Sequence, residues 1–196
     1  MAQSVEIGGL AAELPPPVRL AVAYAPAAAR AAWIALLVFD HRLSRVVAGA
    51  GEPLIGQLKL AWWRDRMREP ASRWPAGEPL LGALKPLATE RASLEALVDG
   101  WEGLIDVDAG DEGPVRLAAA RAGAVAALAR ILDCKIDSSA IAILTRRWTL
   151  PGKGSSRPTR LPRAMRPLVI LANLPGPNDA GPLALLRIVR LGILGR

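Results

Sequence analysis

Residues 18–48 read VRLAVAYAPAAARAAWIALLVFDHRLSRVVA, with apolar positions recurring at helical spacing and one interruption at Pro26. Because proline disrupts a helix interior, we predict a short helix over 18–25 and a longer one over 26–48. Similar patterns predict helices over 53–68, 79–86, 89–106, 114–133, 137–148, 162–173 and 182–194. No segment alternates apolar and polar residues for long enough to indicate a strand. The sequence therefore predicts a single all-α domain.

The composition also favours packed helices. The chain has 196 residues, of which 52% are hydrophobic but only 4% aromatic, so Ala, Leu, Val and Ile supply most of the apolar volume. One cysteine and one histidine exclude an intramolecular disulfide and a zinc site built on several such ligands. We find neither a signal-peptide pattern nor an uncharged run of transmembrane length. We expect a cytoplasmic protein that could associate peripherally with the inner membrane.

Positive charge is concentrated at the C-terminal end. Residues 1–140 hold 15 Lys/Arg and 17 Asp/Glu, a net charge of −2, whereas residues 141–196 hold 10 and 1, a net charge of +9. Residues 146–166 carry seven cations and no acid. A block of one sign suits an anionic membrane surface or an acidic protein partner, and nucleic acid is the less favoured anionic partner. The alternative is a basic face that is simply solvated.

The segment LKLAWWRDR, residues 58–66, is the most distinctive in the chain. On a helix, Lys59 lies four residues before Trp63 and Arg66 lies four residues after Trp62, so each indole can carry a cation over its ring. We expect Trp62 or Trp63 to be largely buried against the helix around residues 27–48. The functional alternative, base stacking, is weaker because neighbouring helical residues point about 100° apart.

Several stretches together resemble the squalene/phytoene synthase family, and more narrowly a short, divergent bacterial branch with a Leu-Ala-Trp-Trp-Arg helix. They are RAAWIALLVFD at 30–40, EPL at 52–54, QLKLAWWRD at 57–65, LPR at 161–163, RPL at 166–168 and the ending over 185–196. The resemblance covers residues 14–196 and leaves 1–13 as a flexible N-terminus. It implies the all-α isoprenoid (terpenoid) synthase fold, a single helical bundle around a central apolar cavity.

In active members, the resemblance implies two aspartate-rich motifs on facing helices that hold Mg²⁺ against a prenyl diphosphate. This chain departs from that pattern at both places. After Phe39 it reads DHRLSR, so Asp40 is the only acid of the first motif, and between Ala140 and Leu161 it has no Asp or Glu at all. We therefore expect no magnesium cluster and assign no catalytic residue, metal ligand or cofactor.

Two functions follow from the resemblance. The first is a degenerate family member without prenyl transferase activity that acts as a binding or assembly factor. The family includes a branch, similarly lacking the aspartates, that serves the assembly of respiratory complex I. The alternative is a magnesium-using transferase of isoprenoid biosynthesis that binds a prenyl diphosphate, or another apolar anionic ligand. The candidate binding residues for such a ligand are Arg30, Asp40, Arg64, Arg146 and Arg147.

Overall fold

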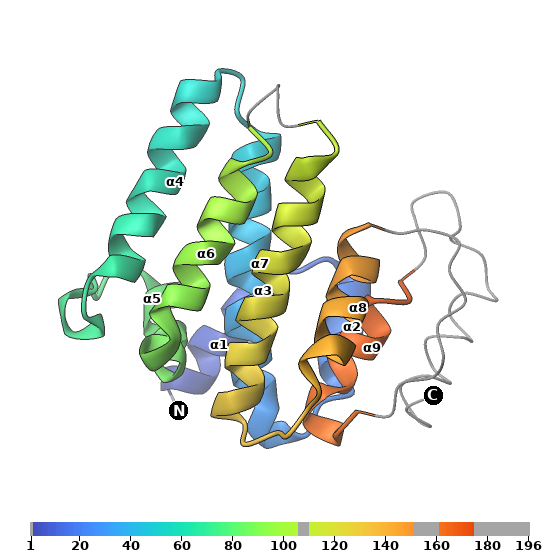
Figure 1. Cartoon of the computed structure of the whole chain (residues 1–196). Coiled ribbons are helices and arrows are strands. Elements are labelled where there is room, and N and C mark those ends of the chain that lie inside the picture. Colours follow the sequence, from blue (N-terminus) through green and yellow to red (C-terminus); the bar gives the residue numbers. More distant parts are fainter. Residues whose placement is uncertain (1, 106–109, 151–160, 175–196) are drawn as a thin grey trace.

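A computed structural model describes residues 2–105, 110–150 and 161–174, and this part of the chain is helical with no strand (Figure 1). The helices are α1 Ala2–Glu13, α2 Pro16–Ala23, α3 Ala27–Ala48, α4 Pro53–Arg68, α5 Pro79–Leu84, α6 Arg91–Glu102, α7 Glu112–Ile131, α8 Ser138–Thr149 and α9 Arg166–Leu171. Short 3-10 helices cover Ala71–Arg73, Lys85–Glu90 and Arg163–Met165. The predicted all-α class is confirmed.

Helix α3 is the centre of the bundle. Every residue from Ala32 to Asp40 is buried, so this part of the helix is covered on all sides. The helices α1, α2, α4, α5, α6 and α7 all pack against it. A helix that is apolar around its whole circumference needs such surroundings, because any exposed side would leave large side chains in water. The middle of the described bundle therefore holds a helix.

Trp63 anchors α4 to this central helix. Its side chain is buried, and its ring lies edge-on to that of Phe39 with centroids 5.4 Å apart. Trp62 is 41% exposed, and its ring lies edge-on to that of Trp63 with centroids 4.8 Å apart. The expectation that one of the two tryptophans is buried against this helix is confirmed.

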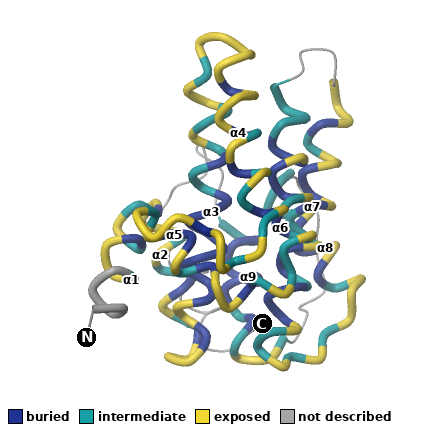
Figure 2. The backbone as a smooth tube through the Cα atoms, turned by 90° about the vertical axis from the view of Figure 1, so that its left-hand side faces the viewer, coloured by how far each residue is buried: buried dark blue, intermediate teal, exposed yellow. Residues whose placement is uncertain are grey.

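Helices α4, α6, α7 and α8 stand side by side across the molecule, as Figure 1 shows. Helix α6 packs against both α4 and α7, and α7 packs in turn against α8. Helix α9 packs against both α8 and α2, at the far side from α4. Figure 2, which looks onto α4, shows exposed positions recurring along it and a largely exposed upper end. Helices α4 and α8 therefore form opposite margins of the bundle.

The N-terminal residues form a helix. Ala2–Glu13 is α1, which packs against α3 and α5 and lies before residue 14, where the family resemblance begins. Leu10 and Leu14 are one helical turn apart and are both buried, while Glu13 binds Arg42 of α3 at 2.8 Å. The helix is held in place by this packing and by the ion pair, neither of which a local pattern shows.

Other boundaries shift by a few residues. The predicted helix over 79–86 ends as α5 at Leu84, because Pro86 lies in a 3-10 helix over Lys85–Glu90 rather than in an α-helix. The predicted helix over 182–194 lies outside the described residues. Among the described helices, none has the length and apolar character needed to span a bilayer.

Candidate functional site

Asp40 lies in the interior, on the buried middle of α3. Its side chain is 8% exposed. The guanidinium of Arg121 forms two hydrogen bonds to it: Nε donates to Oδ1 at 3.0 Å and Nη2 donates to Oδ2 at 2.8 Å. Trp101 of α6 adds a third bond from its indole nitrogen to Oδ1 at 2.9 Å. Both carboxylate oxygens of Asp40 are therefore engaged by protein donors.

Arg121 projects from α7 and is held on every side. Its guanidinium carbon lies 4.3 Å from the ring centroid of Trp148 and 5.0 Å from that of Trp101. Its Nη1 donates to Thr149 Oγ1 at 3.2 Å. Stacking on indoles suits the flat, weakly hydrated guanidinium, and its side chain is only 11% exposed. One cation thus connects α3, α6, α7 and α8.

The residues at this site do not fit a magnesium cluster. Mg²⁺ prefers several oxygen ligands at about 2.1 Å, and the one carboxylate here already makes a bidentate pair with a fixed cation. An added divalent ion would have to displace Arg121 and leave its charge buried without a counterion. In the described part of the chain, no three His, Cys, Asp or Glu side chains come together as a possible metal site.

Arg42 and Arg45 follow Asp40, at the place where the first aspartate-rich motif of the family would continue. Arg42, like Arg121, is paired with carboxylates of this chain. It binds Glu13 of α1 and Glu78, the N-cap residue of α5, each at 2.8 Å. These contacts raise the pKa of Arg42, and the Arg42 hydrogen bond lowers the pKa of the Glu13 carboxyl below its ordinary value. The cation is used to fasten α1 and α5 to α3.

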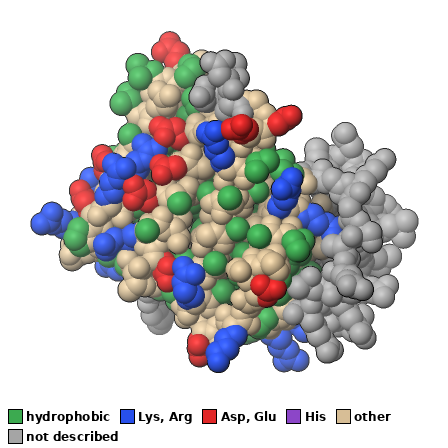
Figure 3. Space-filling model, viewed as in Figure 1, with side chains coloured by type: hydrophobic (Ala, Val, Ile, Leu, Met, Phe, Trp, Pro, Cys, Tyr) green, Lys and Arg blue, Asp and Glu red, His purple; other side chains and the backbone are tan. Residues whose placement is uncertain are grey.

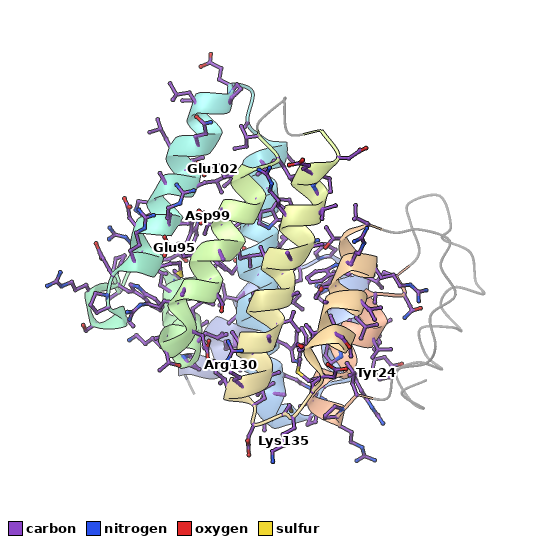
Figure 4. All side chains as sticks on the ribbon, in the orientation of Figure 1. Tyr24, Glu95, Asp99, Glu102, Arg130 and Lys135 are labelled. Carbon is purple, nitrogen blue, oxygen red and sulfur yellow. The ribbon has the colours of Figure 1, made fainter. Side chains whose placement is uncertain are left out.

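Arg64, the arginine of the Trp-Trp-Arg motif, binds acidic side chains of α6. It donates to Asp99 at 2.7 Å and also forms an ion pair with Glu102. Arg68, one turn further along α4, binds Glu95 at 2.7 Å. Figure 4 shows these three acids along the edge of α6 that faces α4. This row of ion pairs joins the two helices. Arg64 is paired with two carboxylates, so its charge is not free to bind a ligand.

The remaining candidate arginines lie elsewhere. Arg30 donates to the carbonyl oxygens of Ala25 and Ala23 at the end of α2, and it precedes Asp40 by ten residues, or about 15 Å along α3. Arg146 is exposed near the end of α8, and Arg147 donates to Asn173 at 3.1 Å. Since α4 and α8 are opposite margins of the bundle, Arg64 does not meet this pair. The structure does not gather the five candidates into one site.

Comparison with known proteins gives a match to a family model. Residues 18–111 match the model of the squalene/phytoene synthase family. This region belongs to the squalene/phytoene synthase family. No curated protein and no solved structure matches the chain. The all-α architecture agrees with this prenyl transferase family, and the matched range contains Asp40 and Trp101 but ends before Arg121.

The sequence interpretation missed Arg121, although a signal for it exists. In α7 the buried positions Leu117, Ala124 and Leu128 recur at helical spacing, and Arg121 falls on the same stripe. A lone cation on an apolar helix face needs a carboxylate from another element. Asp40 presents the converse signal, a single acid after a continuous apolar run. A search for a partner of each isolated charge would have identified the pair of Asp40 and Arg121.

Proposed function

We propose that this squalene/phytoene synthase-like chain lacks prenyl transferase activity and acts as a binding or assembly factor. The observation that supports this most directly is the bidentate pair between Asp40 and Arg121. Asp40 occupies the position where the first aspartate-rich motif of the family begins, and here a side-chain cation of the same chain neutralises it. Assembly of respiratory complex I, the role of a family branch that also lacks the aspartates, is one role of this kind.

The physical case rests on what diphosphate departure requires. A prenyl diphosphate ionises when divalent cations neutralise the leaving group, and those cations need carboxylates that remain free to bind them. Removing Arg121 from Asp40 would leave an unpaired charge among indoles, a change that costs several kcal/mol. The segment between Ala140 and Leu161, the place of the second motif, contains no acid to compensate. Asp40 and Arg121 instead stabilise the junction of α3, α6, α7 and α8.

A diphosphate-release assay tests the missing activity. We expect the full chain to release no diphosphate from farnesyl or geranylgeranyl diphosphate above the rate without protein, with Mg²⁺ present. The reason is that Asp40 is neutralised by Arg121. Parallel reactions with EDTA in place of Mg²⁺ give the baseline, and an active synthase gives the positive control. Release that requires both Mg²⁺ and the protein would contradict the proposal.

We further propose that residues 146–166 bind an anionic membrane surface or an acidic protein partner. Arg146 and Arg163 are exposed, which supports this, while Arg147 contacts Asn173. Residues 151–160, which hold three more of the cations, lie outside the described residues. The supporting argument is therefore the seven cations without an acid in this part of the sequence.

Vesicle co-sedimentation tests this binding. We expect the full chain to pellet with phosphatidylserine-containing vesicles at low salt and to be released at high salt. The variant Arg146→Gln/Arg163→Gln should bind more weakly by about 1 kcal/mol per charge, because each cation near the surface contributes about that much. The control Lys59→Gln/Lys85→Gln removes two exposed cations elsewhere. Equal, negligible pelleting with neutral and anionic vesicles would eliminate the lipid surface.

A further inference from the structure

The outer side of α4 carries a row of exposed apolar side chains. Leu54, Leu58 and Trp62 follow one another at intervals of four residues and are 63%, 60% and 41% exposed, and Ile55 beside them is 45% exposed. Residues four apart on a helix share one face, so these side chains form a continuous strip, which we call the outer stripe. In Figure 3, hydrophobic side chains gather over the upper end of α4.

The inner side of α4 is apolar as well. Its buried residues are Gly56, Leu60, Trp63 and Met67, which face α6 and α3. At 100° per residue, the outer stripe lies on the opposite side of the helix from this set. A helix that is apolar on two opposite sides is typical of one packed on both sides, and the described neighbours of α4 cover only one. The outer stripe therefore has the composition of a contact surface.

The charges around the outer stripe favour protein over lipid. The charged residues that border it are two acids and three bases: Glu52, Asp65, Lys59, Arg66 and Arg68. A helix that lies on an anionic membrane presents free cations to the lipid headgroups, whereas the three arginines of α4 are paired with carboxylates of the same chain. A protein surface with both signs of charge complements this border better, and an antiparallel copy of α4 is such a surface.

We propose that the outer stripe binds the outer stripe of a second copy of this chain, with the two α4 helices antiparallel about a two-fold axis at Leu58. In this register Leu58 packs against Leu58 of the second copy. Leu54 packs against Trp62 of the second copy, since each lies four residues from the axis on opposite sides of it. A two-fold contact of this kind closes on itself and yields a dimer.

The same register also matches the charges at both ends of the outer stripe. Asp65 follows Leu58 by seven residues and so comes next to the first turn of α4 in the second copy. That turn has no acid and no side-chain cap, and it is the positive end of the helix dipole, which a carboxylate stabilises. Arg66, which also binds Glu69 at 3.0 Å and lies over the Trp62 ring, is eight residues from the two-fold axis. Glu52 of the second copy is six residues from it, so the two are about 3 Å apart along the direction of the helices.

The test uses the oligomeric state of the full chain, which has a monomer mass of 20.7 kDa. We expect light scattering and sedimentation velocity to show a concentration-dependent dimer. Leu58→Glu and Leu58→Lys should each weaken the dimer by at least about 30-fold, because each places two like charges at the axis and removes a central anchor. An equimolar mixture of the two variants should dimerise again, since Glu then meets Lys.

Ile143→Glu is the matched control, because Ile143 is an equally exposed apolar residue, at 56%, on α8 at the opposite margin. It should leave the dimer unchanged, and circular dichroism should show that all the variants are folded. Three results would overturn the proposal: a wild-type chain that stays monomeric at high concentration, a Leu58→Glu variant that dimerises normally, or a mixture that stays monomeric. Wild-type monomers that bind neutral vesicles only when Leu58 is intact would assign the outer stripe to lipid instead.

Discussion

Replacing Arg121 by methionine is expected to lower the free energy of unfolding by about 3 to 5 kcal/mol. Methionine keeps much of the apolar volume between Trp101 and Trp148 but leaves the Asp40 carboxylate buried without its cation, and removing one partner of a buried ion pair has a cost of this size. The measurement is urea denaturation at neutral pH, followed by circular dichroism.

The matched control is Arg130→Met. Arg130 binds Glu90 with the same two-bond geometry, at 2.8 and 2.6 Å, but its side chain is 56% exposed. Exposed pairs contribute about 0 to 1 kcal/mol, because water solvates the charges when the pair is broken. If Arg121→Met and Arg130→Met lower the free energy of unfolding equally, burial of the Asp40–Arg121 pair adds nothing to the cost of breaking it.

A double-mutant cycle separates the pair from its surroundings. Asp40→Asn alone should also be strongly destabilising, since it leaves Arg121 as a buried cation without a counterion. The double variant Asp40→Asn/Arg121→Met should lose clearly less than the sum of the two single losses, because it leaves no unpaired charge. Strict additivity would contradict the interpretation of the two residues as one unit.

The sequence was sufficient to predict the helical class and the burial of one of the two tryptophans Trp62 and Trp63. Both follow from helical spacing. The apolar run through Phe39 is too continuous for a surface helix, and two neighbouring indoles on a helix point about 100° apart, so one of them can pack inward. The family resemblance pointed in the same direction and is supported by the match over residues 18–111. These are features that a short window of sequence contains.

The ion pair at Asp40 could not be predicted in the same way. Asp40 and Arg121 are 81 residues apart, and only the packing of α3 against α7 brings them together. The residues Arg30 and Arg64 were chosen as ligand-binding cations for their charge, yet the fold uses them to bind carbonyl oxygens of α2 and acids of α6. A sequence gives the charge of a residue, whereas the fold determines which partner neutralises it.

A second large effect is expected at Gly100, where α6 is in close contact with α7. A Cβ atom added to Gly100 would lie 2.7 Å from the Ala120 Cβ and 3.3 Å from the Leu117 Cα. Gly100→Val should therefore lower the free energy of unfolding by about 3 kcal/mol, at the upper end of overpacking costs, because the two helices must separate. Gly100→Ala should lose less but still be destabilised, although alanine is the better helix former.

Gly123 provides the opposite case on α7. It is exposed, and a Cβ added there meets nothing within 4 Å, so Gly123→Ala should raise stability by up to about 1 kcal/mol through helix propensity alone. Ala120→Gly should recover part of the loss in Gly100→Ala, because it removes the nearest colliding atom. The opposite signs of the two glycine substitutions, measured by urea denaturation, distinguish close helix packing from intrinsic propensity. Stabilisation by Gly100→Ala would mean that α6 and α7 are not in close contact at this position.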